Sequence, residues 1–242
     1  MTMDALFFGA HPDDVELTSG GLAARLASHG HAVGIVDLTR GEAGTRGTPE
    51  VRAREAQAAA LELGVARREC LGLPDTGLDG RDRGQLTAVV ECLRRHRPRL
   101  VVAPDRHDPH PDHIEASRLI ARASLLAGLA RFPAAGERHR PGRLLFATYR
   151  ILSPAPQIVV DVTPVWEQRV RAVRAHASQL GTGEGLSTYL TDTDFLAEVE
   201  ARARVLGASI GARYGEGFRV RGPFGLHDAR PLLDLAGEEA PG

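Results

Sequence analysis

The stretch ALFFGAHPDDVE, residues 5–16, decides the fold class, because an apolar segment there ends abruptly in a group of polar side chains. Its first part, Ala5–Gly9, carries no charge and has the length of a strand buried on both faces of a sheet. Segments of similar apolar character follow at Ala32–Leu38, Leu100–Ala103, Leu144–Tyr149 and Gln157–Val162. Together they predict the strands of a mostly parallel sheet.

Helical patterns separate these strands. In Gly84–His96, the apolar side chains recur at positions i, i+3, i+4 and i+7 and form one stripe. Further helices are expected at Pro49–Leu63, Ile114–Leu129, Pro164–His176 and Phe195–Ala212, and a short strand at Gly217–Arg221. Strands and helices alternate through the first half of the chain, which predicts right-handed βαβ units. We therefore expect an α/β fold, with helices flanking the sheet.

The length and composition fit one domain with a small C-terminal extension. The chain has 242 residues, of which 43% are apolar and 25% charged, as in a typical soluble globular protein. We expect a single domain over residues 1–242. Its core is expected at about residues 4–130, and about residues 144–221 are expected to complete the site.

Charge and sequence pattern exclude several classes of protein. The 30 bases, all arginine, nearly balance 31 acids, and a net charge of −1 argues against nucleic-acid binding. No apolar run is long enough for a membrane span, and the N-terminus lacks the basic region of a signal peptide. Two cysteines, Cys70 and Cys92, are too few for a disulfide framework, so we expect a cytoplasmic protein.

Two groups of histidine and carboxylate side chains carry the predicted chemistry. His11-Pro12-Asp13-Asp14 follows the first predicted strand, and HDPHPDH at residues 107–113 follows Leu100–Ala103. Loops at the carboxyl ends of parallel strands line one crevice. We therefore expect the two groups to face each other, although they are far apart in the sequence.

The residue types suit a zinc site, because zinc binds imidazole nitrogen and carboxylate oxygen, and a catalytic zinc keeps one position for water. Asp13 is then free to act as a base toward water, and His110, oriented by Asp112, to act as an acid. Ferrous iron accepts similar ligands and is the alternative metal. The expected metal ligands are His11, Asp14 and His113.

Each group alone has a simpler interpretation. In the first group, Asp13 or Asp14 could serve only as a helix N-cap, whose carboxylate accepts hydrogen bonds from the first backbone N–H groups of the helix. The prolines of the second group are suited to hold a loop turn. The two groups together, each directly after a predicted strand, favour the metal site.

Three weaker features bear on ligand binding. Gly20-Gly21 predicts either phosphate binding at a helix N-terminus or, more simply, close packing of a helix on the sheet. The glycine-rich loop with Arg40 and Arg46 suits either an anionic substrate group or a flexible surface loop. Arg52, on the next helix, either joins this group or is a solvated charge paired with Glu55.

The sequence resembles the LmbE-like (PIG-L) family of zinc-dependent N-acetylglucosamine deacetylases. The matching motifs are AHPDD at residues 10–14, with Glu16 and Gly20-Gly21, and HPDH at residues 110–113. Within this family it is more similar to the bacillithiol-biosynthesis branch, which deacetylates N-acetylglucosaminyl-malate. That similarity lies in the segments DLTRGE (37–42), GTRGT (44–48), LGLPD (71–75), IG (210–211) and YGEGF (214–218).

The resemblance implies a Rossmann-like α/β domain that assembles as a homotrimer or homohexamer and acts on a small-molecule N-acetylglucosaminyl substrate. It implies the ligand and catalytic roles given above, and a substrate-binding role for Arg52. The predicted substrate-binding set is Arg52, Glu16, Arg46 and Arg40. The arginines favour an anionic aglycone such as malate. The alternatives are another N-acetylglucosaminyl or thiol-conjugate amide, and a non-catalytic sugar-binding module that contains a metal.

Two positions depart from the family pattern, and one segment has an open role. Relatives often carry arginine where Pro109 stands, with Arg106 the nearest substitute. Some relatives carry tyrosine where Phe195 stands, and phenylalanine cannot donate a hydrogen bond to an oxyanion. The groups left for that role are zinc, His110, Tyr149 and Tyr189. Leu180–Thr193 has the composition of a long connection that covers an active site.

Overall fold

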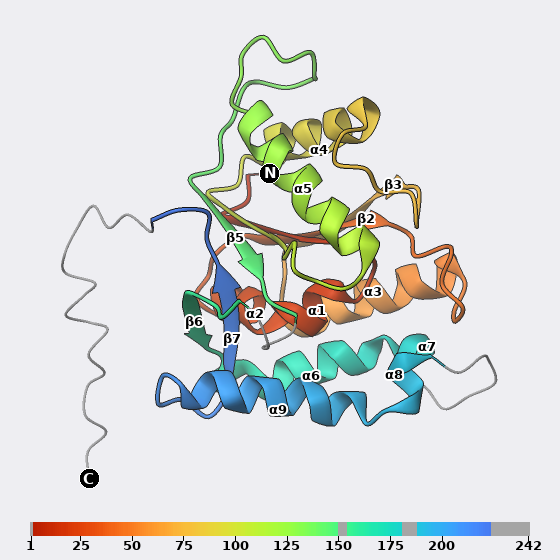
Figure 1. Ribbon diagram of the computed structural model, residues 1–242, viewed down its shortest axis with the longest axis vertical. Coiled ribbons are helices and arrows are strands. Elements are labelled where there is room, and N and C mark those ends of the chain that lie inside the picture. Colours follow the sequence, from red (N-terminus) through yellow and green to blue (C-terminus); the bar gives the residue numbers. More distant parts are fainter. Residues whose placement is uncertain (1, 150–153, 181–187, 224–242) are drawn as a thin grey trace.

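The computed structural model describes residues 2–149, 154–180 and 188–223 (Figure 1). Within them, seven strands form one sheet in the order β3-β2-β1-β4-β5-β7-β6. The strands from β1 to β5 are parallel, and β7 runs antiparallel to both β5 and β6. Their bounds are Ala5–Gly9 (β1), Val33–Thr39 (β2), Arg67–Leu73 (β3), Leu100–Pro104 (β4), Arg143–Ala147 (β5), Ile158–Asp161 (β6) and Gly215–Arg219 (β7). The predicted mostly parallel α/β fold is confirmed.

Strand order places a crevice next to β1. The chain leaves β1 toward β2 and β3 on one side, and returns to β4 and β5 on the other side. The connections at the carboxyl ends of β1 and β4 therefore diverge, and such a switch point is where open α/β sheets bind ligands.

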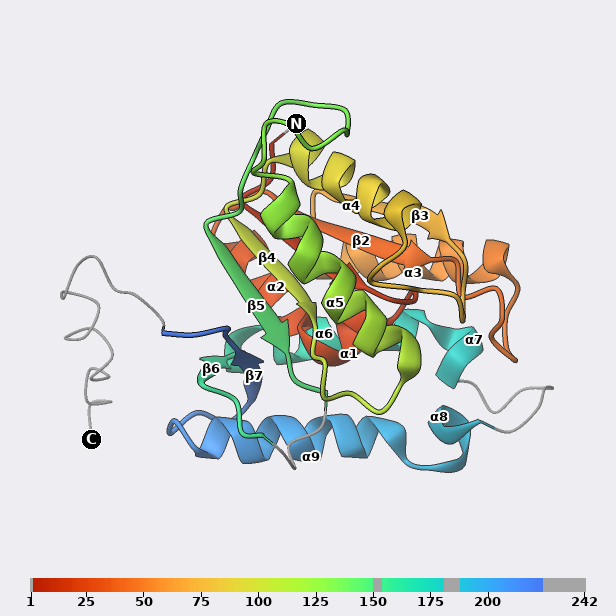
Figure 2. The same cartoon turned by 45° about the horizontal axis from the view of Figure 1, so that its top comes forward.

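Helices cover both faces of the sheet (Figures 1 and 2). On one face lie α4 and α5, which contact each other, and on the other lie α2, α3 and α6. The helix α9 packs against β6 and β7. The bounds are Asp14–Thr18 (α1), Gly20–Ser28 (α2), Pro49–Leu63 (α3), Arg83–His96 (α4), Pro111–Leu126 (α5), Thr163–Val165 (η1), Trp166–Ala175 (α6), Ala177–Leu180 (α7), Tyr189–Asp192 (α8) and Phe195–Ala208 (α9).

Burial of apolar side chains on both faces stabilises this arrangement. Phe7 of β1 faces the cluster under α2, α3 and α6, and Leu6 and Phe8 face the cluster under α4 and α5. All three side chains are at most 3% exposed. A strand that alternates between two apolar cores has a continuous apolar sequence, which explains why the sequence identified β1.

The sequence missed β3, α1 and α2. The strand β3 lies at the edge of the sheet and has the sequence RRECLGL, in which only Arg68 and Leu73 are buried. Charged residues are typical of edge strands, so this segment lacks an apolar run. The helix α1 has only five residues, and α2 begins at once after Ser19, so neither shows a long periodic pattern.

Gly20-Gly21 serves packing. A Cβ on Gly21 would lie 2.7 Å from the Val162 side chain, so only glycine allows α2 to approach this closely. The backbone N–H groups of Gly21 and Leu22 both donate to the Glu216 carboxylate, at 2.7 Å. Because the N-terminus of α2 already binds a carboxylate of this chain, the phosphate interpretation is wrong.

Several element boundaries differ from the predictions. The helix α5 begins at Pro111, three residues before the predicted start, because His110 caps it and Pro111 suits the first helical position. The helix α9 ends at Ala208, where the chain turns back and the N–H of Ala212 donates to the Gly207 carbonyl. Of the predicted covering segment Leu180–Thr193, residues 181–187 lie outside the described residues.

Candidate metal centre and catalytic site

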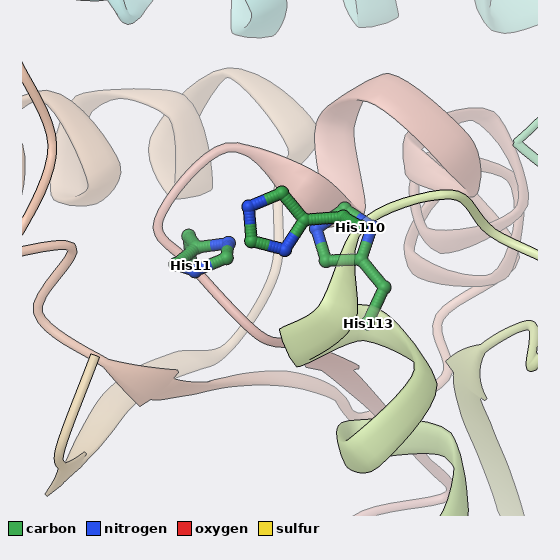
Figure 3. Close-up of side chains that lie close together, drawn as sticks. All are labelled: His11, His110 and His113. Atoms are coloured by element: carbon green, nitrogen blue, oxygen red, sulfur yellow. The ribbon is translucent and has the colours of Figure 1, made fainter. Parts of the chain in front are cut away.

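The two predicted groups meet at the carboxyl ends of β1 and β4. The turn at residues 10–13 joins β1 to α1, and the loop at residues 105–110 joins β4 to α5. Figure 3 shows the imidazoles of His11, His110 and His113 gathered in one place. The ring centroids of His11 and His113 are 5.5 Å apart, and those of His110 and His113 are 4.7 Å apart.

The His-Pro-Asp-Asp turn is tight and strained. Asp13 has a φ of 135°, a conformation that is costly for any residue with a Cβ. The His11 backbone N–H donates to Asp14 Oδ2 at 2.8 Å, and a Cβ on Gly9 would lie 2.8 Å from the His11 carbonyl oxygen. The side chain of Asp13 makes no capping hydrogen bond to α1, which removes the simpler interpretation of this aspartate as a helix cap.

Asp14 joins the two predicted histidine ligands. Its Oδ1 lies 3.1 Å from His113 Nε2, and its Oδ2 lies 3.5 Å from His11 Nδ1. Ligand atoms about 2.0–2.1 Å from a tetrahedral zinc ion are separated from each other by about 3.3 Å. These nitrogen and oxygen atoms therefore suit zinc in both chemistry and spacing. His110 also has a ring nitrogen within 4.8 Å of those of His11 and His113.

In each of the two histidine ligands, the ring nitrogen that faces away from Asp14 contacts another carboxylate. His11 Nε2 lies 3.1 Å from Asp75 Oδ1 and 3.2 Å from Asp112 Oδ2. His113 Nδ1 lies 3.0 Å from Asp108 Oδ2. A carboxylate on the far nitrogen fixes the ring orientation and raises its basicity as a metal ligand, as in many zinc sites.

The predicted pairing of Asp112 with His110 is corrected. The Asp112 carboxylate accepts from the Thr76 backbone N–H at 2.8 Å and contacts His11, as described above. His110 instead uses its Nδ1 to accept the Asp112 backbone N–H at 3.2 Å, because it is the N-cap of α5. Asp112 therefore positions His11, and the helix start orients His110.

The carboxylates make this a site for a cation. Burial opposes the charged form of His113, but Asp14 and Asp108 outweigh it and raise the pKa of His113 to about 10. In the same way, Asp112, Asp14 and Asp75 outweigh burial and raise the pKa of His11 to about 12. Groups arranged this way bind either protons or a metal cation in place of those protons.

Asp13 differs from its neighbour Asp14. It is 7% exposed, and burial, partly offset by the charge of Arg52, raises its pKa to about 6. Burial and the charge of nearby His113 and His11 lower the pKa of His110, which stands exposed at the rim. Asp13 is thus a buried carboxylate of raised basicity beside the candidate metal ligands.

A cavity of about 290 Å³ opens onto these groups. It is large enough for the acetamido group and part of a sugar ring. Its lining includes most of the predicted metal-binding and catalytic side chains. The lining residues are His11, Asp13, Asp14, Leu17, Ala43, Gly44, Arg52, Asp75, Thr76, His110, His113, Tyr149, Gln179 and Leu190.

The structure contradicts a substrate contact of Glu16. Its side chain is 0% exposed and forms an ion pair with the buried Arg68. Arg68 also donates to both carboxylate oxygens of Asp37, at 2.8 Å each. His176 Nε2 lies 3.5 Å from Glu16 Oε1, the same oxygen that Arg68 contacts. Glu16 therefore belongs to an ion network beneath the His-Pro-Asp-Asp turn.

The predicted arginines occupy three different environments. Arg52 is 5% exposed and donates to the carbonyl oxygens of Gly41 at 3.0 Å and Pro12 at 3.1 Å, so it is not a solvated charge. Arg46 donates to the Ser178 carbonyl, and Arg40 is exposed. Of the three, only Arg52 lines the cavity.

The structure also locates residues whose roles the sequence left undecided. Phe195 is buried under Arg202, 5.7 Å from its guanidinium carbon, whereas the Tyr149 ring lines the cavity and stands edge-on to His113. The side chain of Tyr189 lies outside the described residues. Arg106 lines a different cavity, so it does not replace an arginine at position 109 here.

Sequence reasoning assigned no role to Asp75, Thr76, Asp108 or Gln179. Asp108 belongs to the second polar group and Asp75 to a segment that resembles the family, but the sequence alone indicates no function for either. What identifies Asp75 and Asp108 is their contact with the histidine ring nitrogens that face away from Asp14. That contact depends on loops from three different strands meeting, which one sequence does not reveal.

Comparisons with known proteins show the family of the chain. The family model described as PIG-L: GlcNAc-PI de-N-acetylase matches residues 6–124. Diacetylchitobiose deacetylase of Thermococcus kodakarensis is 32% identical over 235 residues, which cover 90% of this chain and 82% of the relative. The 1D-myo-inositol 2-acetamido-2-deoxy-alpha-D-glucopyranoside deacetylase of Rhodococcus jostii is 29% identical over 285 residues, covering 91% and 97%.

A solved structure shows the same fold. The conserved protein TT1542 from Thermus thermophilus superposes with a TM-score of 0.84 at 39% identity, covering 93% of this chain and 97% of that one. The predicted class is confirmed: the protein is an enzyme that acts on an N-acetyl amide. The chain belongs to the PIG-L family, the de-N-acetylases of N-acetylglucosamine derivatives. Among the described residues, every helix is too short or too polar to cross a membrane.

Proposed function

We propose that this protein is a zinc-dependent deacetylase of an N-acetylglucosaminyl compound. The observation that carries the proposal is the position of Asp14 between His11 Nδ1 and His113 Nε2, with the unligated carboxylate of Asp13 beside them. Three protein ligands with an open position are typical of catalytic zinc, whereas structural zinc sites use four protein ligands. Ferrous iron is the alternative metal, since it accepts the same donor atoms.

The chain supplies the groups that amide hydrolysis needs. A bound zinc ion supplies Lewis-acid polarisation of the amide carbonyl and lowers the pKa of water. Asp13 accepts a proton from the attacking water, and its raised pKa of about 6 leaves it ionised but basic near neutral pH. His110, exposed at the rim, takes up a proton from solvent and delivers it to the departing amine nitrogen as the C–N bond breaks, so that acetate and a free amine are released.

Tyr149 is the side chain we propose for the oxyanion role that Phe195 cannot fill. Its ring lines the cavity and stands 6.4 Å, centroid to centroid, from the His113 ring. A tyrosine hydroxyl aimed at the carbonyl oxygen stabilises the negative charge that develops there.

For the substrate, we propose N-acetylglucosaminyl-malate, the compound of the bacillithiol-biosynthesis branch. Support comes from the family-like segments, since Gly44 and Asp75 from two of them line the cavity. The two relatives are named for an inositol-linked substrate and for diacetylchitobiose. Each of these compounds carries a neutral group at the position where the proposed substrate carries malate. These compounds are therefore the alternative substrates to be compared with the malate glycoside.

Free-amine release tests the proposal. Metal-stripped protein is assayed on the malate glycoside, the inositol glycoside, diacetylchitobiose and N-acetylglucosamine, before and after one equivalent of zinc is added. Zinc-restored turnover that is fastest on the malate glycoside supports both parts. Turnover on another N-acetyl sugar supports the deacetylase and refutes malate. Folded, zinc-loaded protein that turns over none of the four favours the non-catalytic sugar-binding module.

The predicted assembly is a separate proposal. We propose a homotrimer or homohexamer on the basis of the family resemblance alone. Light scattering of the purified protein measures the mass, and a monomer at assay concentration contradicts this proposal without affecting the chemistry.

A further inference from the structure

A second polar cavity lies beside the catalytic one, on the face of the sheet that carries α5. It has a volume of about 560 Å³ and shares no lining residue with the catalytic cavity. We name it the β7 cavity. Its lining residues are Asp105, Arg106, His107, Ser117, Phe146, Pro154, Gln157, Arg219, Val220, Arg221 and Gly222.

The floor of the β7 cavity is a polar cluster made by buried Asp105 and Arg219 and exposed His107. Arg219 is 7% exposed, and its Nη1 lies 2.8 Å from Asp105 Oδ2 and 2.6 Å from His107 Nδ1. His107 Nδ1 also lies 2.8 Å from Asp105 Oδ1. These contacts fix Arg219 and His107 in place, so the cluster is preorganised before any ligand enters.

The cavity has an excess of positive charge. Arg106, Arg219 and Arg221 line it, against a single carboxylate, that of Asp105. The guanidinium carbon of Arg221 lies 5.1 Å from the centre of the Phe146 ring, which holds this exposed side chain over the cavity wall. Polar and positively charged walls around a small volume attract anions.

Three polar atoms of the cavity lining lack a hydrogen-bond partner within the described residues: Ser117 Oγ, Arg219 Nε and Asp105 Oδ2. Of these, Asp105 Oδ2 is an acceptor that faces Arg219 Nη1 at 2.8 Å, so the donors without an acceptor are Ser117 Oγ and Arg219 Nε. A buried donor without an acceptor costs free energy, and residues that lack one mark places where a ligand or ion completes the set. Ser117 lies one helical turn after the metal-ligand candidate His113, so the two cavities adjoin along α5.

We propose that the β7 cavity binds a small oxyanion, the phosphoryl or carboxylate group of a metabolite. Arginine guanidinium groups match the geometry of such groups with paired N–H donors, and a serine hydroxyl adds a further donor. The site is separate from the catalytic cavity. It adjoins the loop at residues 105–110, which also carries Asp108 and His110.

Isothermal titration calorimetry of the zinc-loaded full chain tests the proposal. Inorganic phosphate and succinate are titrated separately at constant ionic strength, and the tighter of the two identifies the ligand class. We expect saturable one-to-one binding. Arg106→Gln and Arg221→Gln are each expected to weaken it by about tenfold or more, since each removes a charged hydrogen-bond donor. Both side chains are exposed, so neither substitution disturbs the core.

Two controls separate this site from the catalytic one. Arg54→Gln removes another exposed arginine, on the opposite face of the sheet, and is expected to leave binding unchanged. Metal-stripped protein is expected to retain binding, because the β7 cavity contains no predicted metal ligand. The proposal is overturned by absence of saturation with both anions, by unchanged affinity in both arginine variants, or by loss of binding when zinc is removed. None of these results bears on deacetylase activity.

Discussion

The guanidinium group of Arg52 holds the turn that presents Asp13. Its Nη2 lies 3.1 Å from the Pro12 carbonyl oxygen and 3.5 Å from Asp13 Oδ1, and its Nη1 donates to the Gly41 carbonyl. Asp13 has a strained φ of 135°, which persists only where the surroundings fix it. Arg52 therefore connects the loop after β2 to the turn after β1 and is a positioning residue for Asp13.

Replacing Arg52 is expected to change the pH dependence of activity. Burial raises the pKa of Asp13 and the Arg52 charge lowers it, so Arg52→Gln raises that pKa further above about 6. Because Asp13 accepts a proton only when ionised, the acidic limb of the kcat/KM profile shifts to higher pH. A misplaced base also lowers kcat, by up to about a hundredfold. Arg52→Lys partly restores the profile, and Arg54→Gln is the matched control; an unshifted limb in Arg52→Gln contradicts this role.

Asp13 and Asp14 are expected to separate catalysis from metal binding. Asp13→Asn keeps the zinc content and loses activity by about 10²–10⁴-fold, the usual contribution of a general base. Asp14→Ala and His113→Ala lose the metal together with activity, because each removes a candidate ligand. Zinc content by plasma emission spectrometry and amine release are measured on the same samples. Near wild-type turnover by Asp13→Asn shows that another group is the base.

Asp108 is expected to support metal binding without contacting the metal. Its carboxylate lies 3.0 Å from His113 Nδ1, and loss of such a partner typically weakens metal affinity by about 10–100-fold. Asp108→Ala is compared with Asp4→Asn, which removes a carboxylate at the opposite end of β1. Competition with a chelator measures both affinities. If the two variants bind zinc equally well, Asp108 does not act through His113.

The buried Glu16 is expected to make stability depend on acid pH. Burial opposes its ionisation, but Arg68 and His176 outweigh burial and lower the pKa of Glu16 from 4.5 to about 2. A lowered folded-state pKa stabilises the protein above the unfolded-state pKa, and this contribution disappears as pH falls from 4.5 through about 2. It amounts to about 3 kcal/mol. Urea unfolding of wild type and Glu16→Gln across this range measures it, and equal pH slopes for the two proteins argue against it.

The candidate site was only partly predictable from the sequence. His11, Asp13, Asp14, His110 and His113 line one cavity, as two polar groups at the ends of parallel strands lead one to expect. The assignments of Glu16 and Asp112 were wrong because sequence position gives no side-chain direction. Glu16 lies on α1, the same short helix as Asp14, but its side chain is buried in the core. The carboxylate of Asp112 contacts His11.

What the sequence determined by itself is the sheet and the two polar groups at its edge. Apolar runs such as Ala5–Gly9 must be buried on both faces, and that requirement acts locally along the chain. The tertiary structure alone decided that Asp75 and Asp108 contact the two histidines, that Arg52 holds Asp13, and that the β7 cavity exists. Each of these depends on loops from different strands meeting in space. Contacts between such loops are determined by the packing of the whole fold, so local sequence patterns do not predict them.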